Sequence, residues 1–195
     1  MTSGAARASL FLTSLLLDRL ERKPFTLRGR AYLMLTIAGC FAWNATHSLT
    51  AAAFTNAAGI TIPDIGSGSP YPSTINVSGM AGAVSKVTVK LNQIAHTYPD
   101  DIDVLLVGPG GQSVLLMSDV GGAVGVSGVT VTLDDAATKS LPDSTRISTS
   151  TYKPTNVGAG DTFAAPALAG PYGALLSVFN GTAPNGVWSL YVVDD

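Results

Sequence analysis

The stretch IDVLLVGPGGQSVLLM, residues 102–117, indicates the fold class of this chain. Two apolar runs, Ile102 to Val107 and Ser113 to Met117, flank the turn sequence GPGG at 108–111. Proline fixes φ and glycine accepts the positive φ that a tight reversal needs. The stretch therefore predicts a β-hairpin.

Similar short runs lie on both sides of this hairpin. In VTVKL, residues 87–91, apolar and polar residues alternate, which places the two valines and the leucine on one buried face. Residues 129–133 and 187–193 alternate in the same way, and the nearly continuous apolar run 174–179 is also expected to be extended. Residues 136–171 alternate little and are rich in Pro, Thr and Ala, which predicts a long ordered loop.

The composition fits one compact domain with many turns. The chain has 195 residues, of which 46% are hydrophobic and only 12% charged, with 21 glycines. No internal repeat and no linker is visible. From residue 54 onward the pattern predicts a single antiparallel all-β sandwich of about seven or eight strands.

Charge is distributed unevenly along the sequence. Six of the eleven basic residues lie within the first thirty residues. The remainder carries eleven aspartates and five basic residues, a net charge of −6. An acidic body repels phosphate backbones, which argues against nucleic acid as a partner and favours divalent cations.

The pattern of the first 53 residues predicts a secretory signal. The apolar run AYLMLTIAGCFAW, residues 31–43, follows the basic stretch RKPFTLRGR, residues 22–30. Thirteen residues are too few to span a bilayer, which takes about twenty. Ala51, Ala52 and Ala53 supply an A-x-A cleavage pattern, so the mature chain is expected to begin at Phe54 and to be secreted or held at the cell surface of a bacterium.

Two further features of this segment leave alternatives open. Residues 37–40, IAGC, resemble a lipobox, which would make Cys40 a lipidation site and the membrane a partner through a lipid anchor. The simpler interpretation is that Cys40, the one cysteine, is a small apolar residue of the signal. The pattern of residues 8–22 predicts a short amphipathic helix ahead of the signal. The sequence therefore predicts an N-terminal helical signal segment that is followed by a β-sandwich.

Three stretches of the body carry a family resemblance. They are VSKVTVKL at 84–91, HTYPDDIDVLLVGPGG at 96–111 and FNGTAPNGVWSL at 179–190, with PYPS at 70–73 before them. In this order and spacing they resemble the P domain, or P/Homo B domain, of proprotein convertases. That domain follows the catalytic domain of kexin- and furin-like subtilases and also occurs in bacterial exported proteins.

The resemblance implies a jelly-roll-like, galactose-binding-like β-sandwich that stabilises or targets a neighbouring protein and has no catalytic residues. Two departures matter: the chain contains no subtilase catalytic domain, and it stops at Asp194 and Asp195, where the family continues into a further strand. We therefore expect a signal over 1–53 and a P-domain-like sandwich over 54–195 that lacks its last strand.

His96 is the one histidine after residue 54, and it is the natural candidate for a catalytic base. Residues 125–128, GVSG, do not form the G-x-S-x-G elbow of a serine hydrolase. We therefore expect no enzyme activity and a structural hydrogen bond between His96 and Asp101 across a turn. Trp188 shares its phase with Leu190 and Val192, which predicts a core position.

Asp100, Asp101 and Asp103 are the candidate ligands for calcium, which prefers several carboxylate and carbonyl oxygens. Adjacent turns could add the carboxylates at 119, 134 and 135. The spacing does not match an EF-hand loop, and the alternative is a set of solvated turn residues that cap backbone groups. Four tyrosines in expected loops are candidates for an exposed contact surface: Tyr71, Tyr98, Tyr152 and Tyr172.

Three functional hypotheses follow from these patterns. The first is a non-catalytic structural or interaction module of an exported bacterial protein. The second is an accessory domain of a secreted subtilisin- or kexin-like protease, with proteolysis supplied elsewhere. The third is a calcium-dependent carbohydrate-binding sandwich.

Overall fold

The structure is a computed structural model that describes residues 8–21 and 48–195, with side chains from residue 51 onward. Its strands are β1 (Ala8–Glu21), β2 (Ser48–Phe54), β3 (Gly59–Ile62), β4 (Gly66–Ser67), β5 (Ser73–Val77), β6 (Val84–His96), β7 (Ile102–Val107), β8 (Ser113–Ser118), β9 (Val126–Leu133), β10 (Ser150–Tyr152), β11 (Thr155–Asn156) and β12 (Gly186–Asp194). Two short 3₁₀ helices, η1 (Pro99–Asp101) and η2 (Leu176–Phe179), interrupt the loops.

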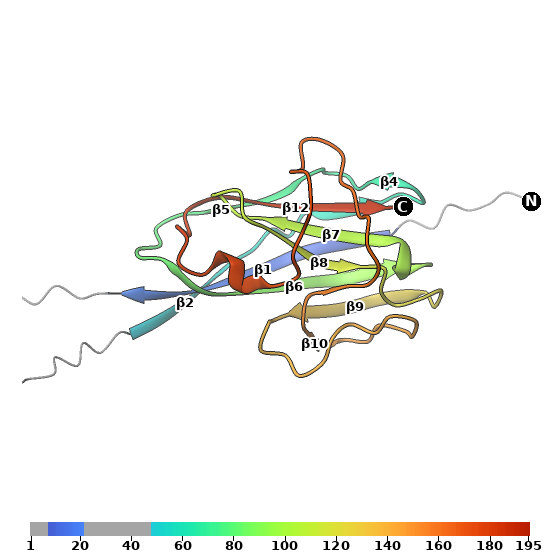
Figure 1. The fold of residues 1–195 in the computed structure, drawn as a ribbon, viewed down its shortest axis with the longest axis horizontal. Helices are drawn as coiled ribbons and strands as arrows, with labels where there is room; N and C mark the ends of the chain where they lie inside the picture. Colours follow the sequence, from blue (N-terminus) through green and yellow to red (C-terminus); the bar gives the residue numbers. More distant parts are fainter. Residues whose placement is uncertain (1–7, 22–47) are drawn as a thin grey trace, which may run out of the picture.

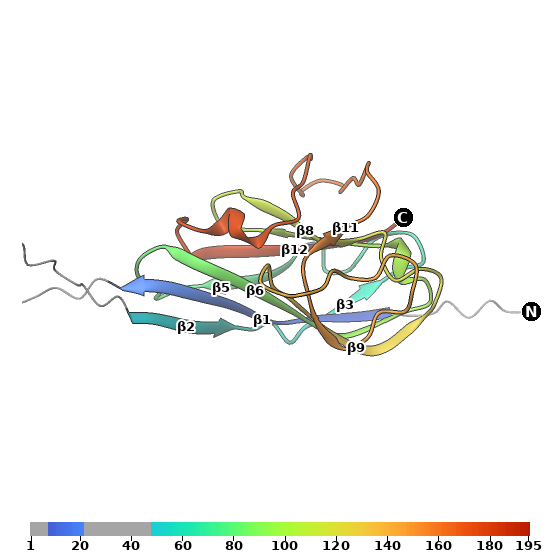
Figure 2. The same cartoon turned by 60° about the horizontal axis from the view of Figure 1, so that its bottom comes forward.

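These strands form two six-stranded sheets that lie face to face (Figures 1 and 2). Sheet A has the order β10-β9-β6-β1-β2, and β3 pairs with β1 as well. Sheet B has the order β11-β8-β7-β12-β4, and β5 pairs with β12. The described chain is thus an all-β sandwich, as the sequence predicts.

The main core lies between the two sheets. In β12 the alternation holds: Trp188, Leu190 and Val192 are at most 1% exposed and face the other sheet. The alternating residues Val87, Val89 and Leu91 of β6 meet them from sheet A. The predicted core position of Trp188 is confirmed.

A smaller apolar cluster covers the outer face of sheet B. It combines Leu105 and Val107 of β7 with Tyr191 and Val193 of β12, and the loop residue Phe163 packs on them. This second cluster explains why β7 is buried at every position, since one of its faces meets sheet A and the other lies under the 157–175 loop.

The predicted hairpin is confirmed. Strands β7 and β8 pair antiparallel, and the Gly108 N–H donates to the Gln112 carbonyl at 2.8 Å to close the turn. The long loop over 136–171 is also largely as expected, but it contains β10 and β11, which pair parallel with β9 and β8. These two- and three-residue strands are too short to show a periodic pattern.

Two expected elements are wrong. Residues 174–179 end in the 3₁₀ helix η2 instead of a strand, because the Asp135 carboxylate accepts the N–H groups of Leu176 and Ser177 and caps a helical turn there. Residues 8–21 form β1 instead of an amphipathic helix. Strands on both sides of β1 take up its backbone groups, and such tertiary pairing overrides local helix propensity.

The last strand and the predicted cleavage sequence both lie within the sheets. β12 is flanked by β7 on one side and by β4 and β5 on the other. Ala51 to Ala53, the predicted cleavage sequence, lie within β2, whereas the apolar run 31–43 with Cys40 lies outside the described residues. Among the residues that the structure describes, no helix has the length and apolar character to cross a membrane.

Candidate functional site

Carboxylates gather at one end of the sandwich, which we call the acidic end. Strands β7, β8 and β12 are antiparallel neighbours, so the start of β7 and the ends of β8 and β12 meet there. The helix η1 and the loop after β11 contribute further residues to the same end. The acidic end consists of Asp100, Asp101, Asp103, Asp119, Asp161, Asp194 and Asp195.

His96 joins the two sheets at the acidic end. Its Nε2 lies 2.9 Å from Oδ2 of Asp194, and both side chains are almost fully buried, with 4% and 1% exposed. Its Nδ1 lies 2.7 Å from the Tyr98 carbonyl oxygen. Both ring nitrogens of His96 therefore lie within hydrogen-bonding distance of protein oxygens.

The predicted hydrogen bond between His96 and Asp101 is wrong in its partner. The carboxylate that lies 2.9 Å from Nε2 of His96 is that of Asp194 on β12, whereas Asp101 lies on η1 and affects the ring through its charge. Burial raises the pKa of Asp194, and the histidine opposes that rise. Asp194 shares the inward phase of Trp188, Leu190 and Val192, a signal that sequence reasoning could have used.

A second group of carboxylates surrounds the hydroxyl of Ser118 at the end of β8. Ser118 Oγ donates to Asp161 Oδ1 at 2.6 Å and lies 3.2 Å from Asp119 Oδ2. Asp103 on β7 also contacts this hydroxyl, and the Asn156 amide donates to Asp161 at 3.2 Å. Ser118, Asn156 and Asp161 are far from Asp103 in sequence, and nothing in their local pattern marks them.

The hydroxyl of Ser118 carries one hydrogen, so it can satisfy only one carboxylate at a time. Asp103 is 2% exposed, and burial raises its pKa to about 7, with the charges of Asp161, Asp195 and Asp119 adding to the rise. Burial also raises the pKa of Asp119. The carboxylates around Ser118 are thus crowded and partly buried, and both effects favour their neutral, protonated form.

The three predicted calcium ligands do not point to a common centre. Asp100 accepts the Gly122 N–H at 3.2 Å, Asp101 lies on η1 near His96, and Asp103 turns toward Ser118. Of the carboxylates expected to join them, Asp119 does and Asp134 does not. Within residues 51–195, no three His, Cys, Asp or Glu side chains are grouped closely enough to hold a metal ion. Calcium binding stays a prediction.

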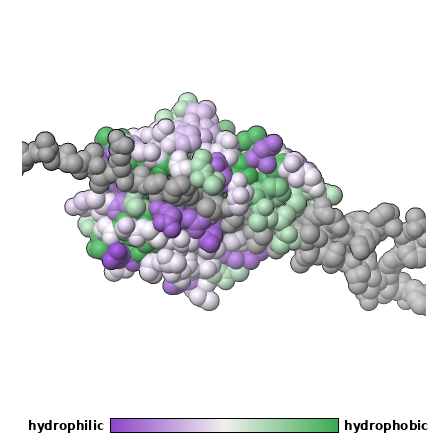
Figure 3. Space-filling model, turned by 180° about the vertical axis from the view of Figure 1, so that it is seen from behind, coloured by the Kyte–Doolittle hydropathy of each residue, from purple (hydrophilic) through white to green (hydrophobic). Residues whose placement is uncertain are grey.

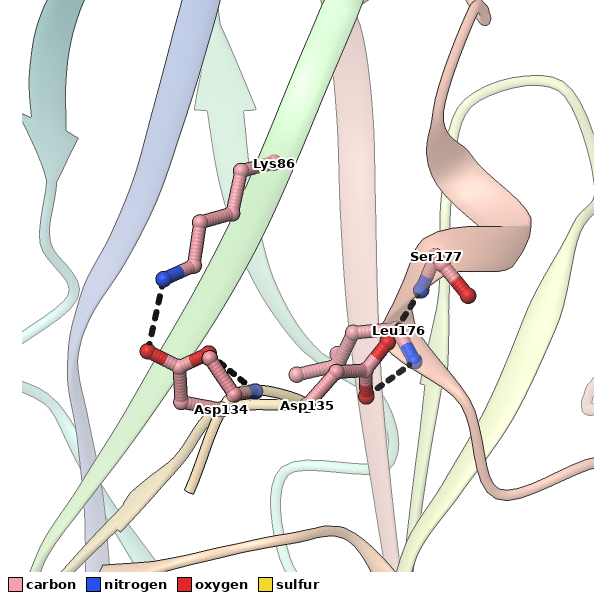
Figure 4. A network of polar contacts seen from close by, with 6 residues as sticks. Lys86, Asp134, Asp135, Leu176 and Ser177 are labelled. Atoms are coloured by element: carbon pink, nitrogen blue, oxygen red, sulfur yellow. Dashed lines mark hydrogen bonds and ion pairs between the residues drawn. The ribbon is translucent and has the colours of Figure 1, made fainter. Parts of the chain in front are cut away.

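Asp134 and Asp135 lie at a separate polar site, shown in Figure 4. Lys86 Nζ on β6 lies 2.8 Å from Asp134 Oδ2, and the other carboxylate oxygen of Asp134 accepts the Ala136 N–H. Burial alone would raise the pKa of Asp134, but these two hydrogen bonds outweigh it and lower the pKa.

The neighbouring Asp135 turns the other way and ties sheet A to η2. Its two oxygens accept the N–H groups of Leu176 at 2.9 Å and Ser177 at 2.8 Å (Figure 4). A shallow hollow of about 250 Å³ lies between Lys86, Asp135 and Asn180. Because its carboxylates are already paired, this site resembles a structural joint more than a ligand site.

The four tyrosines expected on the surface separate into three environments. Tyr152 is buried in the main core, whereas Tyr98 is 52% exposed. Tyr71 and Tyr172 lie over the outer face of sheet B, where their hydroxyls donate to the carbonyls of Ala164 and Leu168. They hold the 157–175 loop instead of forming a free contact surface.

Large exposed apolar side chains are spread along the chain. Figure 3 shows polar and apolar residues intermixed over the described part of one face. Scattered apolar residues are normal on protein surfaces, so they do not mark an interface by themselves. They are Ile65, Tyr98, Val124, Leu168, Leu175, Val178 and Val187.

The stretches that carry the family resemblance pack against one another. A Cβ at Gly108 would lie 2.9 Å from the ring of Phe179 and 3.4 Å from that of Trp188. A Cβ at Gly186 would lie 2.7 Å from Pro109, and φ of Gly186 is +130°. The turn GPGG must therefore keep its glycine at 108 for the aromatic pair Phe179–Trp188, whose ring centroids are 4.8 Å apart, to pack beneath it.

Comparison of the chain with protein-family models, with curated proteins and with solved structures finds no match.

Proposed function

We propose that this chain is a non-catalytic β-sandwich module of the P-domain type, with jelly-roll-like topology, in an exported bacterial protein. It stabilises or positions a neighbouring protein, and a secreted subtilisin-like protease is the favoured neighbour. Proteolysis would be supplied by that neighbour and not by this chain.

One observation carries the proposal: the three separate stretches that resemble the P domain form a single packed unit. Gly108 from the second stretch lies against Phe179 and Trp188 from the third, and β6 from the first faces them across the core. The Trp188 indole N–H donates to the Pro184 carbonyl at 2.9 Å, which fixes the ring. The residues that support the resemblance thus have structural roles.

The surroundings of His96 also support a non-catalytic role. A general base must reach a substrate or a nucleophile with one ring nitrogen. Here both nitrogens are engaged and the side chain is 4% exposed. The ring instead joins β6 to the end of β12.

Expression of the full chain, with its own N-terminus, in a bacterium tests the export and the partner together. We expect the protein outside the cytoplasm with Phe54 as its first residue, and we expect chemical crosslinking to capture a subtilisin-like protease. A matched Gly108→Leu variant, which disturbs the packing of the resembling stretches, should capture less protease. A chain that stays in the cytoplasm with residues 1–53 intact would contradict the proposal.

A calcium-supported fold is the second candidate function, favoured by the carboxylates of Asp103, Asp119 and Asp161 that gather around the Ser118 hydroxyl. Calcium that binds the folded chain and not the unfolded one raises the midpoint of thermal unfolding, and the rise grows with the logarithm of the calcium concentration above the dissociation constant. We expect a rise of several degrees in millimolar calcium and none with excess chelator, and the Asp161→Asn variant should lose most of the rise. An identical midpoint of thermal unfolding in calcium and in chelator would show that calcium does not stabilise the fold. Trp188 is fully buried, so it offers no platform for stacking on a sugar.

A further inference from the structure

We propose that the place of β1 in sheet A is a strand-acceptor site, which takes up an extended segment of the partner protein once residues 1–53 are removed. The inference rests on the export proposed above, because the expected signal cleavage is the step that vacates the site. The backbone pairing of β1 and the position of the cleavage sequence carry it.

β1 is an interior strand with partners on both edges (Figures 1 and 2). On one edge it pairs antiparallel with β6, from Phe11 opposite Asn92 to Arg19 opposite Val84. On the other edge it pairs with β3 at its start and with β2 along its second half. It is therefore the strand that connects β3 and β2 to the rest of sheet A.

The predicted cleavage would remove this strand. The sequence Ala51 to Ala53 lies inside β2, so a cut after Ala53 releases all of β1 and all but Phe54 of β2. β6 would then lose its partner along 84–92, and β3 would lose its described partner in sheet A. The remaining strands, β4, β5 and β7 to β12, keep their pairings, and β6 keeps its pairing with β9.

The vacated position would be costly to leave open. The residues of β3 and β6 that flank it include Ile60, Val89 and Leu91, each fully buried in the intact sandwich. Loss of the strand would bring water to this part of the core and leave a row of backbone N–H and C=O groups of β6 unpaired. An added strand restores both, which is how β-augmentation gives affinity.

The register of β1 defines the segment that the site accepts. It is an extended stretch of about nine residues, the length paired with β6 in this structure, that runs antiparallel to β6 and contains no proline. Its alternate residues must be apolar, because one face of the strand lies over the core. Residues 11–19, FLTSLLLDR, hold this place within the chain itself.

The test uses the full chain with a specific protease sequence inserted after Lys23, outside the described strands. After cutting, we expect the N-terminal fragment to stay bound in size-exclusion chromatography. A labelled peptide of residues 8–21 should then displace it. The matched peptide with Leu15→Pro loses the N–H of residue 15 in the strand beside β6 and should bind at least tenfold more weakly. The proposal is overturned if the fragment leaves and the rest keeps its thermal midpoint, or if both peptides bind equally.

Hydrogen exchange of the unmodified chain provides a second measurement should the insertion disturb folding. If β1 can be replaced by another strand, its amides should lose protection sooner than those of β7 and β12. Equal protection of the three strands would contradict the replacement of β1. Mass spectrometry of the exported N-terminus tests the proposed function separately. An exported chain that begins at Phe54 and ignores the peptide refutes the strand site alone. A chain that binds the peptide but keeps residues 1–53 refutes the export and makes β1 a permanent strand.

Discussion

Two contacts of nearly equal length between a basic and an acidic side chain show how the environment decides what such a contact contributes to stability. The His96–Asp194 pair is 2.9 Å long and almost fully buried, whereas the Lys86–Asp134 pair is 2.8 Å long with the lysine side chain 43% exposed. Water screens the exposed pair and solvates either partner alone. In the buried pair neither side chain can turn to water, so each depends on the other.

The difference extends to the carboxylates around each pair. Near Lys86, the ammonium and a backbone N–H lower the pKa of Asp134. At the acidic end, burial and neighbouring carboxylates raise the pKa values of Asp101, Asp103, Asp119 and Asp194. Neighbouring aspartates therefore stabilise the fold where hydrogen-bond donors and a basic side chain reach their carboxylates, and they repel one another where these partners are lacking.

The largest expected effect comes from breaking the buried pair. His96→Ala leaves the Asp194 carboxylate buried without its partner, so the free energy of unfolding should fall by about 3–5 kcal/mol at neutral pH. Urea unfolding at 25 °C measures the loss. Adding Asp194→Asn to this variant removes the stranded charge and should recover part of the stability; a double variant as unstable as the single one would assign the loss to packing instead.

The next effect is a dependence of stability on pH. The folded chain holds a proton on Asp103 up to a pH of about 7, whereas the ordinary pKa is 3.8, so the folded state binds more protons between these values. The contribution is complete below the ordinary pKa and is lost as pH rises through about 7. We expect the chain to be more stable at pH 5 than at pH 8, by about 2 kcal/mol from this group.

Asp103→Asn is the matched control for this pH dependence. The amide cannot ionise and can still donate to Ser118 Oγ, so the variant should exceed the parent in stability by more at pH 8 than at pH 5, and the two should converge only below the ordinary pKa of 3.8. Thermal unfolding at the two pH values measures both differences. Parallel pH profiles for parent and variant would show that Asp103 is not the group responsible.

A smaller effect is expected where Asp135 caps η2. Asp135→Ala leaves the N–H groups of Leu176 and Ser177 without their acceptor, which should cost about 1–2 kcal/mol. Urea unfolding gives the total, and faster hydrogen exchange at residues 176–179 locates it. Asp135→Asn keeps an acceptor oxygen and should lose less; equal losses would argue that the charge, and not the cap, is what matters.

The smallest effect is expected from the exposed pair. Lys86→Met keeps the aliphatic stem and removes the ammonium, and such surface pairs contribute about 0–1 kcal/mol. The loss should shrink further in 0.5 M salt, because exposed charges are screened. A loss equal to that of His96→Ala would erase the contrast between the two pairs.

The sequence predicts those parts of the fold that depend on neighbours along the chain. Alternation locates β6, β9 and β12 and puts Trp188 in the core, and turn chemistry locates the hairpin of β7 and β8. The failures depend on distant partners. The helix η2 is capped by a carboxylate 41 residues earlier, and β1 is held extended by strands that begin at least 27 residues later.

In the candidate site, too, local sequence locates the individual residues, whereas their partners are set by the fold. Asp100, Asp101 and Asp103 are adjacent in sequence, yet the fold points them at three different groups. Asp161 and Ser118, which meet at 2.6 Å, lie 43 residues apart, so no local spacing could pair them. The partner of His96 was predictable only in part, since the phase of β12 points Asp194 inward but does not say which residue it meets.

The topology of sheet B also has a consequence for the order of events during synthesis. Its interior strand β12 is the last of its strands along the chain, and it pairs with β4, β5 and β7, which are made about 80 to 130 residues earlier. Such non-local pairing makes folding slow relative to helical proteins. Sheet B therefore cannot close during synthesis until residues 186–194 have left the ribosome, so β4, β5 and β7 stay without their common partner until then.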